Sequence, residues 1–299
     1  MPAPTPIRFA AAAPTLFVVL WSSGFIGAKA GVPYAEPFTF LLLRFVLVLA
    51  LMTPLAFVWR ARWPTRGRDV AHLAVAGMLL HGGYLGGCFT AVHHGMPAGV
   101  IALVVGLQPV LTAFAAAPLL GERITRTQWL GLALGLAGVA LVVWDKIALR
   151  GLAPLSIVWS VVALLSITSG TVYQKRYCPT FDLRTGSLIQ FAAAFVLLLP
   201  LAWATESMHV VWHPDFVFAL VWLALVLSIG AISLLFHLIE HGEATRVASL
   251  FYLTPLVTAA MAWLMFDETL TARALAGMAV GILGVALVVR RPADVAPEA

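Results

Sequence analysis

The side chains best suited to chemistry in this sequence are polar residues set within long apolar stretches. Arg44 stands about eight residues into one such stretch, and His81 and Tyr84 follow in the next one, three positions apart. On a helix, residues three apart lie on one face. Glycines surround this pair at Gly82-Gly83 and Gly86-Gly87 and permit close helix approach or local distortion. The pair either binds a small polar molecule or contains a histidine that is satisfied within the core.

Arg44 has two interpretations. At roughly 1.5 Å per residue it lies about 12 Å along its helix, where an uncompensated charge in lipid is costly, so it should face the protein interior. It either attracts a substrate carboxylate or has a structural role, bonded to helix-end carbonyls or to Glu36. Gln190, at the corresponding place in the second half of the chain, is neutral, which slightly favours the structural role.

Hydroxyl groups form a second set of candidates. Ser166, Ser169 and Tyr173 follow the spacing i, i+3, i+7 and should lie on one helix face, where they bind either substrate or a neighbouring helix. Gln108 and Thr254 directly precede Pro109 and Pro255. Each proline lies near the middle of an apolar stretch, removes a backbone hydrogen bond and should kink its helix. Such kinks serve either as hinges with exposed carbonyls or as static packing features.

Aromatic residues divide by depth. Six tryptophans near the ends of the apolar stretches fit the interfacial belts of a membrane protein: Trp59, Trp63, Trp129, Trp144, Trp203 and Trp212. The deeper residues either line a cavity for large apolar side chains or face lipid: Trp21, Phe25, Tyr84, Trp159, Phe251 and Tyr252.

Catalytic and metal sites are not expected. Ser22-Ser23-Gly24 lacks the Gly-x-Ser-x-Gly turn that activates a serine, so an intramembrane enzyme is a weak alternative. The histidines lack carboxylates or thiols at ligand spacing. The sequence has no phosphate-binding loop of the Walker type, so neither ATP hydrolysis nor a cofactor is predicted.

The elements that must position these residues are membrane helices. Of 299 residues, 62% are hydrophobic and 10% are charged, against about 45–50% and about 25% in soluble domains. The net charge of +5 comes from basic residues in short turns, which indicates topology signals and lipid headgroups rather than nucleic acid. Two cysteines provide no disulfide framework.

A membrane-spanning helix needs about 20 apolar residues. The sequence therefore predicts an all-α integral membrane protein with ten transmembrane helices, near residues 11–31, 36–58, 70–92, 96–118, 127–145, 152–173, 184–204, 216–238, 245–265 and 271–289.

The chain repeats itself at an offset of 146 residues. This offset pairs Lys29 with Lys175, aligns Pro109-Val110-Leu111-Thr112-Ala113 with Pro255-Leu256-Val257-Thr258-Ala259, and pairs Glu122 with Glu268. Five helices per copy is an odd number, so the second copy must be inverted. The predicted units are residues 1–146 and 147–299. The paired positions of Trp21, Ser22 and Phe25 hold different residue types, so the substrate site should be asymmetric.

Charge placement sets the orientation. Thirteen Lys and Arg residues fall on the side of the N-terminus and four on the other side. By the positive-inside rule, both termini are predicted to be cytoplasmic, in a bacterial inner membrane.

Inverted repeats around a midplane site are typical of secondary transporters, although channels also use them. The Ser22-Ser23-Gly24 patch with Lys29, the Arg44-Phe45 pair and the repeated block from Pro109 through Gly121-Glu122-Arg123 to Val143 resemble the EamA-type branch of the drug/metabolite transporter superfamily, most of all the YddG-type amino acid exporters. This resemblance implies export of small metabolites, with neutral and aromatic amino acids as the expected substrates. Another metabolite or drug class is the alternative.

Every Asp and Glu of the ten-span region falls in a turn or near a span end, which weakens proton antiport. Passive export is therefore expected, with proton coupling through His81 or His237 as the alternative. Gly131, Gly135 and Gly138, with their copies Gly277, Gly281 and Gly284, predict close-packing faces, either between the fifth and tenth helices or in a homodimer.

Overall fold

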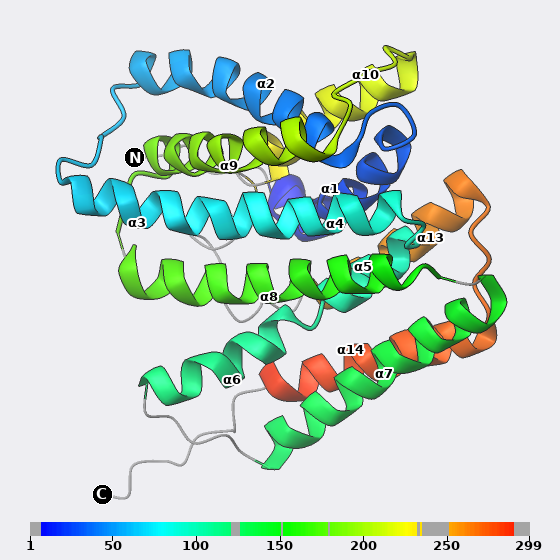
Figure 1. Ribbon diagram of the computed structural model, residues 1–299. Helices are drawn as coiled ribbons and strands as arrows, with labels where there is room; N and C mark the ends of the chain where they lie inside the picture. The colour runs from blue at the N-terminus through cyan, green and yellow to red at the C-terminus, as the bar shows by residue number, and fades with distance from the viewer. Residues whose placement is uncertain are drawn as a thin grey trace, which may run out of the picture.

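The computed structural model describes residues 7–120, 126–150, 152–178, 180–231, 234 and 251–289. The helices of this part are α1 (Ile7–Gly31), α2 (Pro37–Val58), α3 (Gly67–Gly77), η1 (Met78–Gly83), α4 (Tyr84–His93), α5 (Ala98–Val105), α6 (Gln108–Leu120), α7 (Arg126–Arg150), α8 (Pro154–Tyr177), α9 (Leu183–Thr205), α10 (Pro214–Val221), η2 (Trp222–Ala231), η3 (Phe251–Leu253), α13 (Thr254–Phe266) and α14 (Ala272–Val289) (Figure 1).

The described part of the chain is helical and apolar, and its β-structure is a single isolated bridge between Ala35 and Val210. Six helices are long and apolar enough to cross a membrane, and four shorter apolar helices accompany them. Each of the ten predicted ranges overlaps a described helix. The all-α membrane class is confirmed, and the count of ten crossings stays a prediction.

Helices of the two sequence halves pack against each other in related pairs. α2 packs on α9, and α7 packs on α14. In each pair, the offset of 146 residues relates one helix to the other. The contact of α1 with α13 has its counterpart in the contact of α8 with α6. In Figure 1, α2 runs toward the left and its counterpart α9 toward the right. These pairings are those expected of two halves related by a pseudo-two-fold axis.

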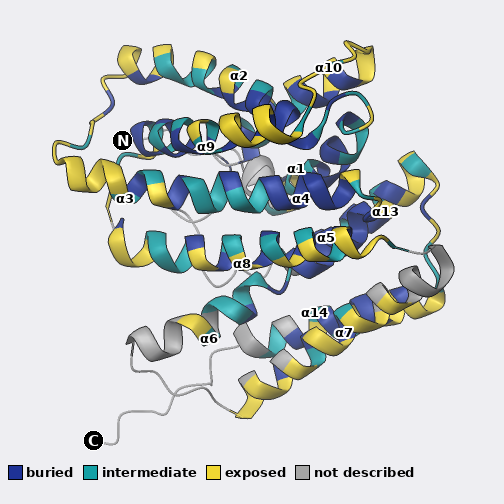
Figure 2. Cartoon of the chain, viewed as in Figure 1, coloured by how far each residue is buried: buried dark blue, intermediate teal, exposed yellow. Residues whose placement is uncertain are grey.

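Apolar side chains cover the outside of the bundle. Figure 2 shows exposed residues along the outer faces of α2, α7 and α9, with buried residues concentrated in α4 and α5. Val46, Leu165 and Val196 are among the exposed large apolar residues, as expected of a surface whose solvent is lipid. The six tryptophans assigned to interfacial belts are all exposed.

The glycine faces of α7 and α14 pack against each other within one chain. A Cβ added at Gly138 would lie 2.4 Å from the backbone nitrogen of Gly281, and one at Gly284 would lie 2.4 Å from that of Gly135. The prediction of close-packing glycine faces is confirmed. Because these faces are already covered, they give no support to a homodimer, which stays a prediction without an assigned surface.

Replacing Gly138 with alanine is expected to destabilise the protein by about 1–3 kcal/mol, because the new methyl group meets backbone that cannot move aside. Gly67→Ala is the matched control, since nothing lies within 4 Å of a Cβ added there. Thermal unfolding of the purified proteins in detergent measures the difference. Equal melting temperatures for the two variants would contradict the close packing of α7 on α14.

Two wide helical turns lie at corresponding places in the two halves. η1 and η2 are π-helical, and the offset of 146 residues carries positions 78–83 onto 224–229, inside η2. The glycines beside η1 permit close helix contacts: a Cβ at Gly83 would lie 2.5 Å from the Ser166 hydroxyl, and one at Gly87 2.8 Å from the backbone of Ala163. Both close approach and local distortion therefore occur here. π-turns are frequent at functional sites.

The prolines disrupt their helices differently from the prediction. The structure breaks the fourth apolar stretch at Gly106-Leu107, so Pro109 is the second residue of a new helix, α6, rather than the centre of a kinked one. Pro255 is likewise the second residue of α13. Proline fits a first helical turn because the N–H that it lacks has no intrahelical acceptor there. Their role as hinges stays a prediction.

Candidate binding cavity

A central cavity of about 300 Å³ lies between helices of both sequence halves. It is bounded by α1, α2, η1 with α4, α8, α9 and η2. Its polar lining consists of Arg44, His81, Tyr84, Gln174, Ser187, Gln190 and Ser228, and its aromatic lining of Trp21, Phe25, Tyr84, Phe89, Phe181 and Phe191. This volume is at the lower end of the range for ligand pockets and suits a small metabolite.

Arg44 is the charged group of this cavity. Its side chain is 4% exposed, and the guanidinium donates to the Ser228 hydroxyl from Nε at 3.3 Å and from a terminal nitrogen at 3.0 Å. Ser228 in turn donates to the carbonyl of Leu223 at 3.0 Å. Among the described residues, no carboxylate forms an ion pair with Arg44. Free guanidinium donors therefore remain for a ligand in the cavity.

The expected structural partner of Arg44, Glu36, is engaged elsewhere. Its carboxylate accepts from the backbone N–H of Ser207 at 2.7 Å and from the Ser207 hydroxyl at 2.6 Å. The alternative in which Glu36 neutralises Arg44 is therefore wrong. The physical reason is position: Glu36 precedes the first residue of α2, whereas Arg44 lies two turns further along the helix.

His81 and Tyr84 both line the cavity, on the face that their spacing predicts. The imidazole of His81 stacks on Phe191 of α9, with ring centroids 4.2 Å apart and an interplanar angle of 20°. Trp21 and Phe25 reach the same cavity from α1. The structure thus brings together five predicted site residues, namely Trp21, Phe25, Arg44, His81 and Tyr84, without testing whether they bind substrate.

Two candidates lie at the contact between α1 and α13 instead. The Ser22 hydroxyl donates to the carbonyl of Thr254 at 3.4 Å, and Thr258 donates to the carbonyl of Ser22 at the same distance. The Thr254 hydroxyl is buried and has no hydrogen-bond partner among the residues that the structure describes. The side chain of Tyr252 lies outside the described residues, as does His237.

The remaining candidates lie outside the central cavity. Gln108 donates to Thr171 of α8 at 3.2 Å. Ser166 packs against Gly83, and Ser169 is exposed and bonds the carbonyl of Leu165 of its own helix. The hydroxyl of Tyr173 lies 2.8 Å from the His72 ring, and Trp159 packs on Phe38. In this conformation none of the three residues of the polar stripe on α8 lines the central cavity, and Tyr173 is the member whose side chain forms a hydrogen bond with another described helix.

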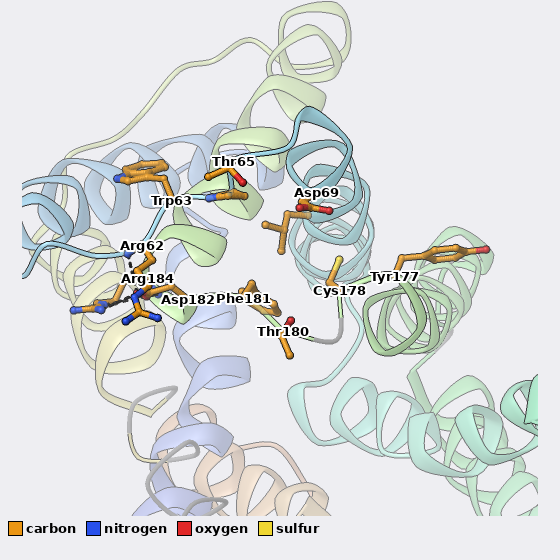
Figure 3. Close-up of a pocket in the computed structure, with 12 residues that line it drawn as sticks. Arg62, Trp63, Thr65, Asp69, Tyr177, Cys178, Thr180, Phe181, Asp182 and Arg184 are labelled. Carbon is orange, nitrogen blue, oxygen red and sulfur yellow. Dashed lines mark hydrogen bonds and ion pairs between the residues drawn. The ribbon is translucent and has the colours of Figure 1, made fainter.

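A larger hollow of about 870 Å³, here called the vestibule, lies where the α2–α3 connection meets the α8–α9 connection (Figure 3). Its charged lining is Arg62, Asp69, Asp182 and Arg184, and its aromatic lining is Trp63, Tyr177 and Phe181. Phe181 also lines the central cavity, so the two spaces adjoin at this ring.

At the opposite end of the bundle, two carboxylates of the second half bond to residues of the first half. Glu268 is 3% exposed, forms an ion pair with Lys29 of α1 and accepts from the backbone N–H of Ala98. Glu206 accepts from the backbone N–H groups of Phe38 and Thr39 at 2.7 Å each, at the start of α2. These contacts lie at the end of α1 and α2 remote from the vestibule.

Sequence reasoning missed two cavity residues, Ser228 and Gln190, and the buried Glu268 at the opposite end of the bundle. Ser228 is an isolated hydroxyl in an apolar stretch, and nothing in the sequence places it opposite Arg44. Gln190 carried a usable signal, because it is a polar residue deep in a span and the repeat partner of Arg44. Glu268 looks like a turn residue in the sequence, and only the fold shows that it is buried.

A helical membrane bundle built from two related halves, with a buried cavity between them, defines a multi-pass membrane transporter. The chain belongs to the EamA-like transporter family, which matches residues 10–144 and 154–290 as two copies. This confirms the resemblance to EamA-type exporters of the drug/metabolite transporter superfamily, and one matched range falls in each of the two predicted units. The protein is a small-molecule exporter rather than an enzyme, and it is a multi-pass protein of the bacterial inner membrane.

Two curated relatives carry names that mention amino acids. A protein of Escherichia coli K12 named "probable amino-acid metabolite efflux pump" is 29% identical over 266 residues, which cover 86% of each chain. A protein of Streptantibioticus cattleyicolor named "probable terminal-alkyne amino-acid exporter" is 30% identical over 288 residues, which cover 92% of each chain. A solved crystal structure matches with a TM-score of 0.62 at 20% identity, covers 94% of this chain and 96% of its own, and supports the fold.

Proposed function

We propose that this protein exports amino acids, or metabolites that keep an amino acid carboxylate, by alternating access, with Arg44 binding the carboxylate. The observation that carries the proposal is a buried guanidinium, without a carboxylate partner among the described residues, on the wall of a cavity. A buried charge without a counter-ion is costly unless a ligand supplies one. The names of the two curated relatives support the same substrate class.

The lining of the central cavity favours substrates with an apolar or aromatic side chain. Trp21, Phe25 and Phe191 contribute aromatic surface. The described residues that line the cavity include no carboxylate, so an ammonium group would have to be met by neutral acceptors such as Gln190 and Tyr84. The carboxylate is therefore the group that the central cavity requires most.

The membrane topology is part of the proposal. Ten spans in two inverted units, residues 1–146 and 147–299, with both termini in the cytoplasm, are supported by the opposite directions of α2 and α9 and by the excess of basic residues on one side. With this orientation the vestibule faces the cytoplasm and the pair Lys29–Glu268 faces the outside.

This arrangement supports an inward-facing state. The vestibule adjoins the central cavity at the proposed cytoplasmic end, while Glu206 and Glu268 bond the two halves together at the proposed outer end. Exchange of conformations between the two halves would open the outer end. Pro109 and Pro255, each at the start of a helix, are the proposed hinges. Export is proposed to run down the substrate gradient.

The test is counterflow of labelled phenylalanine in proteoliposomes, with four unlabelled competitors. Phenylalanine and 3-phenylpropionate, which keep the carboxylate, should compete, whereas phenylalaninamide and phenylethylamine, which lack it, should not. Competition by the amine as strong as that by the acid would overturn the role of Arg44. An imposed pH gradient that strongly changes the rate would overturn passive export in favour of proton coupling.

A further inference from the structure

The central cavity offers no charged partner for the ammonium group of an amino acid among its described lining residues. Arg44 can bind a carboxylate, but no carboxylate among the described lining residues is available for an ammonium group. A site of this kind accepts an amino acid and the corresponding deaminated acid with similar ease. A carboxylate elsewhere on the substrate's route would discriminate between them more strongly than the neutral acceptors Gln190 and Tyr84 of the central cavity.

The vestibule contains such a group. Asp182 and Arg184 neutralise each other, since the Arg184 guanidinium donates to Asp182 at 2.7 Å and 3.0 Å and thereby holds the pKa of that carboxyl well below its usual range. Arg62 and Asp69 remain, and neither forms an ion pair with a described residue. Figure 3 shows these two on opposite sides of the hollow.

Asp69 has surroundings that suit an ammonium ligand. It lies in the first turn of α3, and the wall around it includes Leu73, Tyr177 and Cys178. The pKa of the Cys178 thiol is raised by burial and by the nearby Asp69 carboxylate, so this sulfur stays protonated and does not compete as an anion. The carboxylate thus faces a partly apolar wall on one side of the vestibule.

The backbone next to Arg62 is fixed, which gives the opposite wall a defined position. The Arg62 N–H donates to Asp182 at 3.1 Å, and its carbonyl accepts from the Thr185 hydroxyl at 2.7 Å. Phe181 stands between this wall and the central cavity, and its ring packs so closely on Gly186 that a Cβ there would lie 2.1 Å from it. A substrate that leaves the vestibule past Phe181 enters the cavity that holds Arg44.

We propose that the vestibule is a second binding site for zwitterionic amino acids, in which the Asp69 carboxylate binds the ammonium group before the substrate passes Phe181. The inference rests on the proposed function, because it concerns the route of the same substrate to Arg44. It assigns recognition of the two charged groups to two places: the amine to the vestibule and the carboxylate to the central cavity.

The experiment measures half-saturation at the cytoplasmic face in sided proteoliposomes made of phosphatidylcholine alone, so that anionic lipid cannot contribute. Asp69→Asn should raise the half-saturation concentration for phenylalanine about threefold to fivefold, the range for an exposed charge contact. It should leave that for 3-phenylpropionate unchanged. Asp69→Glu, which keeps the charge, should restore the selectivity. Asp215→Asn, an exposed acid at the opposite end, is the matched control and should change neither value.

The outcomes separate this inference from the proposed function. If Asp69→Asn changes the half-saturation concentrations of both substrates equally, or changes neither, the proposed vestibule site is wrong. This holds even where Arg44→Met abolishes transport. If Asp69→Asn does not fold, the comparison of Asp69→Glu with the wild-type protein decides: loss of the preference for phenylalanine despite a retained carboxylate overturns the proposal. If the wild-type protein transports neither these two compounds nor any other amino acid, the proposed function itself is wrong.

Discussion

Replacing Arg44 with methionine is expected to lower the affinity for phenylalanine by about 100-fold, the loss of about 3 kcal/mol that follows removal of one partner of a buried charged contact. The methionine fills much of the same space and leaves Ser228 bonded to the Leu223 carbonyl. Substrate-dependent stabilisation of the purified protein, followed by thermal unfolding, measures the affinity.

The unliganded stability of the same variant separates a binding role from a structural role. A buried guanidinium with one hydroxyl partner costs free energy, so Arg44→Met should unfold at the same temperature as the wild-type protein or above it. Ser228→Ala, which removes the orienting partner but keeps the charge, should lose affinity only severalfold. If Arg44→Met melts well below the wild-type protein and still binds substrate, Arg44 is structural.

Replacing Lys29 with methionine is expected to destabilise the protein by about 2 kcal/mol. Glu268 would keep its bond from the Ala98 N–H but lose its cation while remaining 3% exposed. Removal of one partner from a buried ion pair costs roughly 3–5 kcal/mol, and the partial exposure of Lys29 reduces this figure. Thermal unfolding in detergent at neutral pH measures the loss.

The double variant Lys29→Met/Glu268→Gln is the control, because it removes both charges together. It should recover most of the lost stability, since a neutral amide can still accept from Ala98. The pair also ties α1 of the first repeat to the connection before α14 of the second. If the double variant is as unstable as Lys29→Met alone, the ion pair does not account for the effect.

The periodic features of the sequence predicted the fold well. Apolar length located the helices, and the internal offset predicted two repeats, each of which contains one of the ranges that the family model matches. The glycine faces of α7 and α14 followed from spacing alone, because small residues at regular intervals have few uses other than close helix contact. The interruption at Gly106-Leu107 was underestimated, since proline indicates a disrupted helix without fixing whether it bends or breaks.

The candidate site was predictable where one residue type had few options. Arg44 had to face inward because lipid cannot solvate it, and the cavity lies beside it. Hydroxyls carry no such constraint: Ser169 bonds a carbonyl of its own helix and Tyr173 bonds His72 of α3, whereas Ser228 lies in the cavity. Which of several equivalent hydroxyls faces a cavity depends on helix rotation, and the wide turns at η1 and η2 change that rotation in ways that spacing cannot reveal.

The wide turn at η2 also makes helix winding part of the site. Ser228 bonds the carbonyl five residues before it, and that hydroxyl is the group to which Arg44 donates. If η2 rewound as an ordinary α-helix, the directions of its side chains would change relative to those of α10. Because Ser228 lies within η2, its hydroxyl would turn away from Arg44. The orientation of an arginine in the first repeat therefore depends on the number of residues per helical turn in the second.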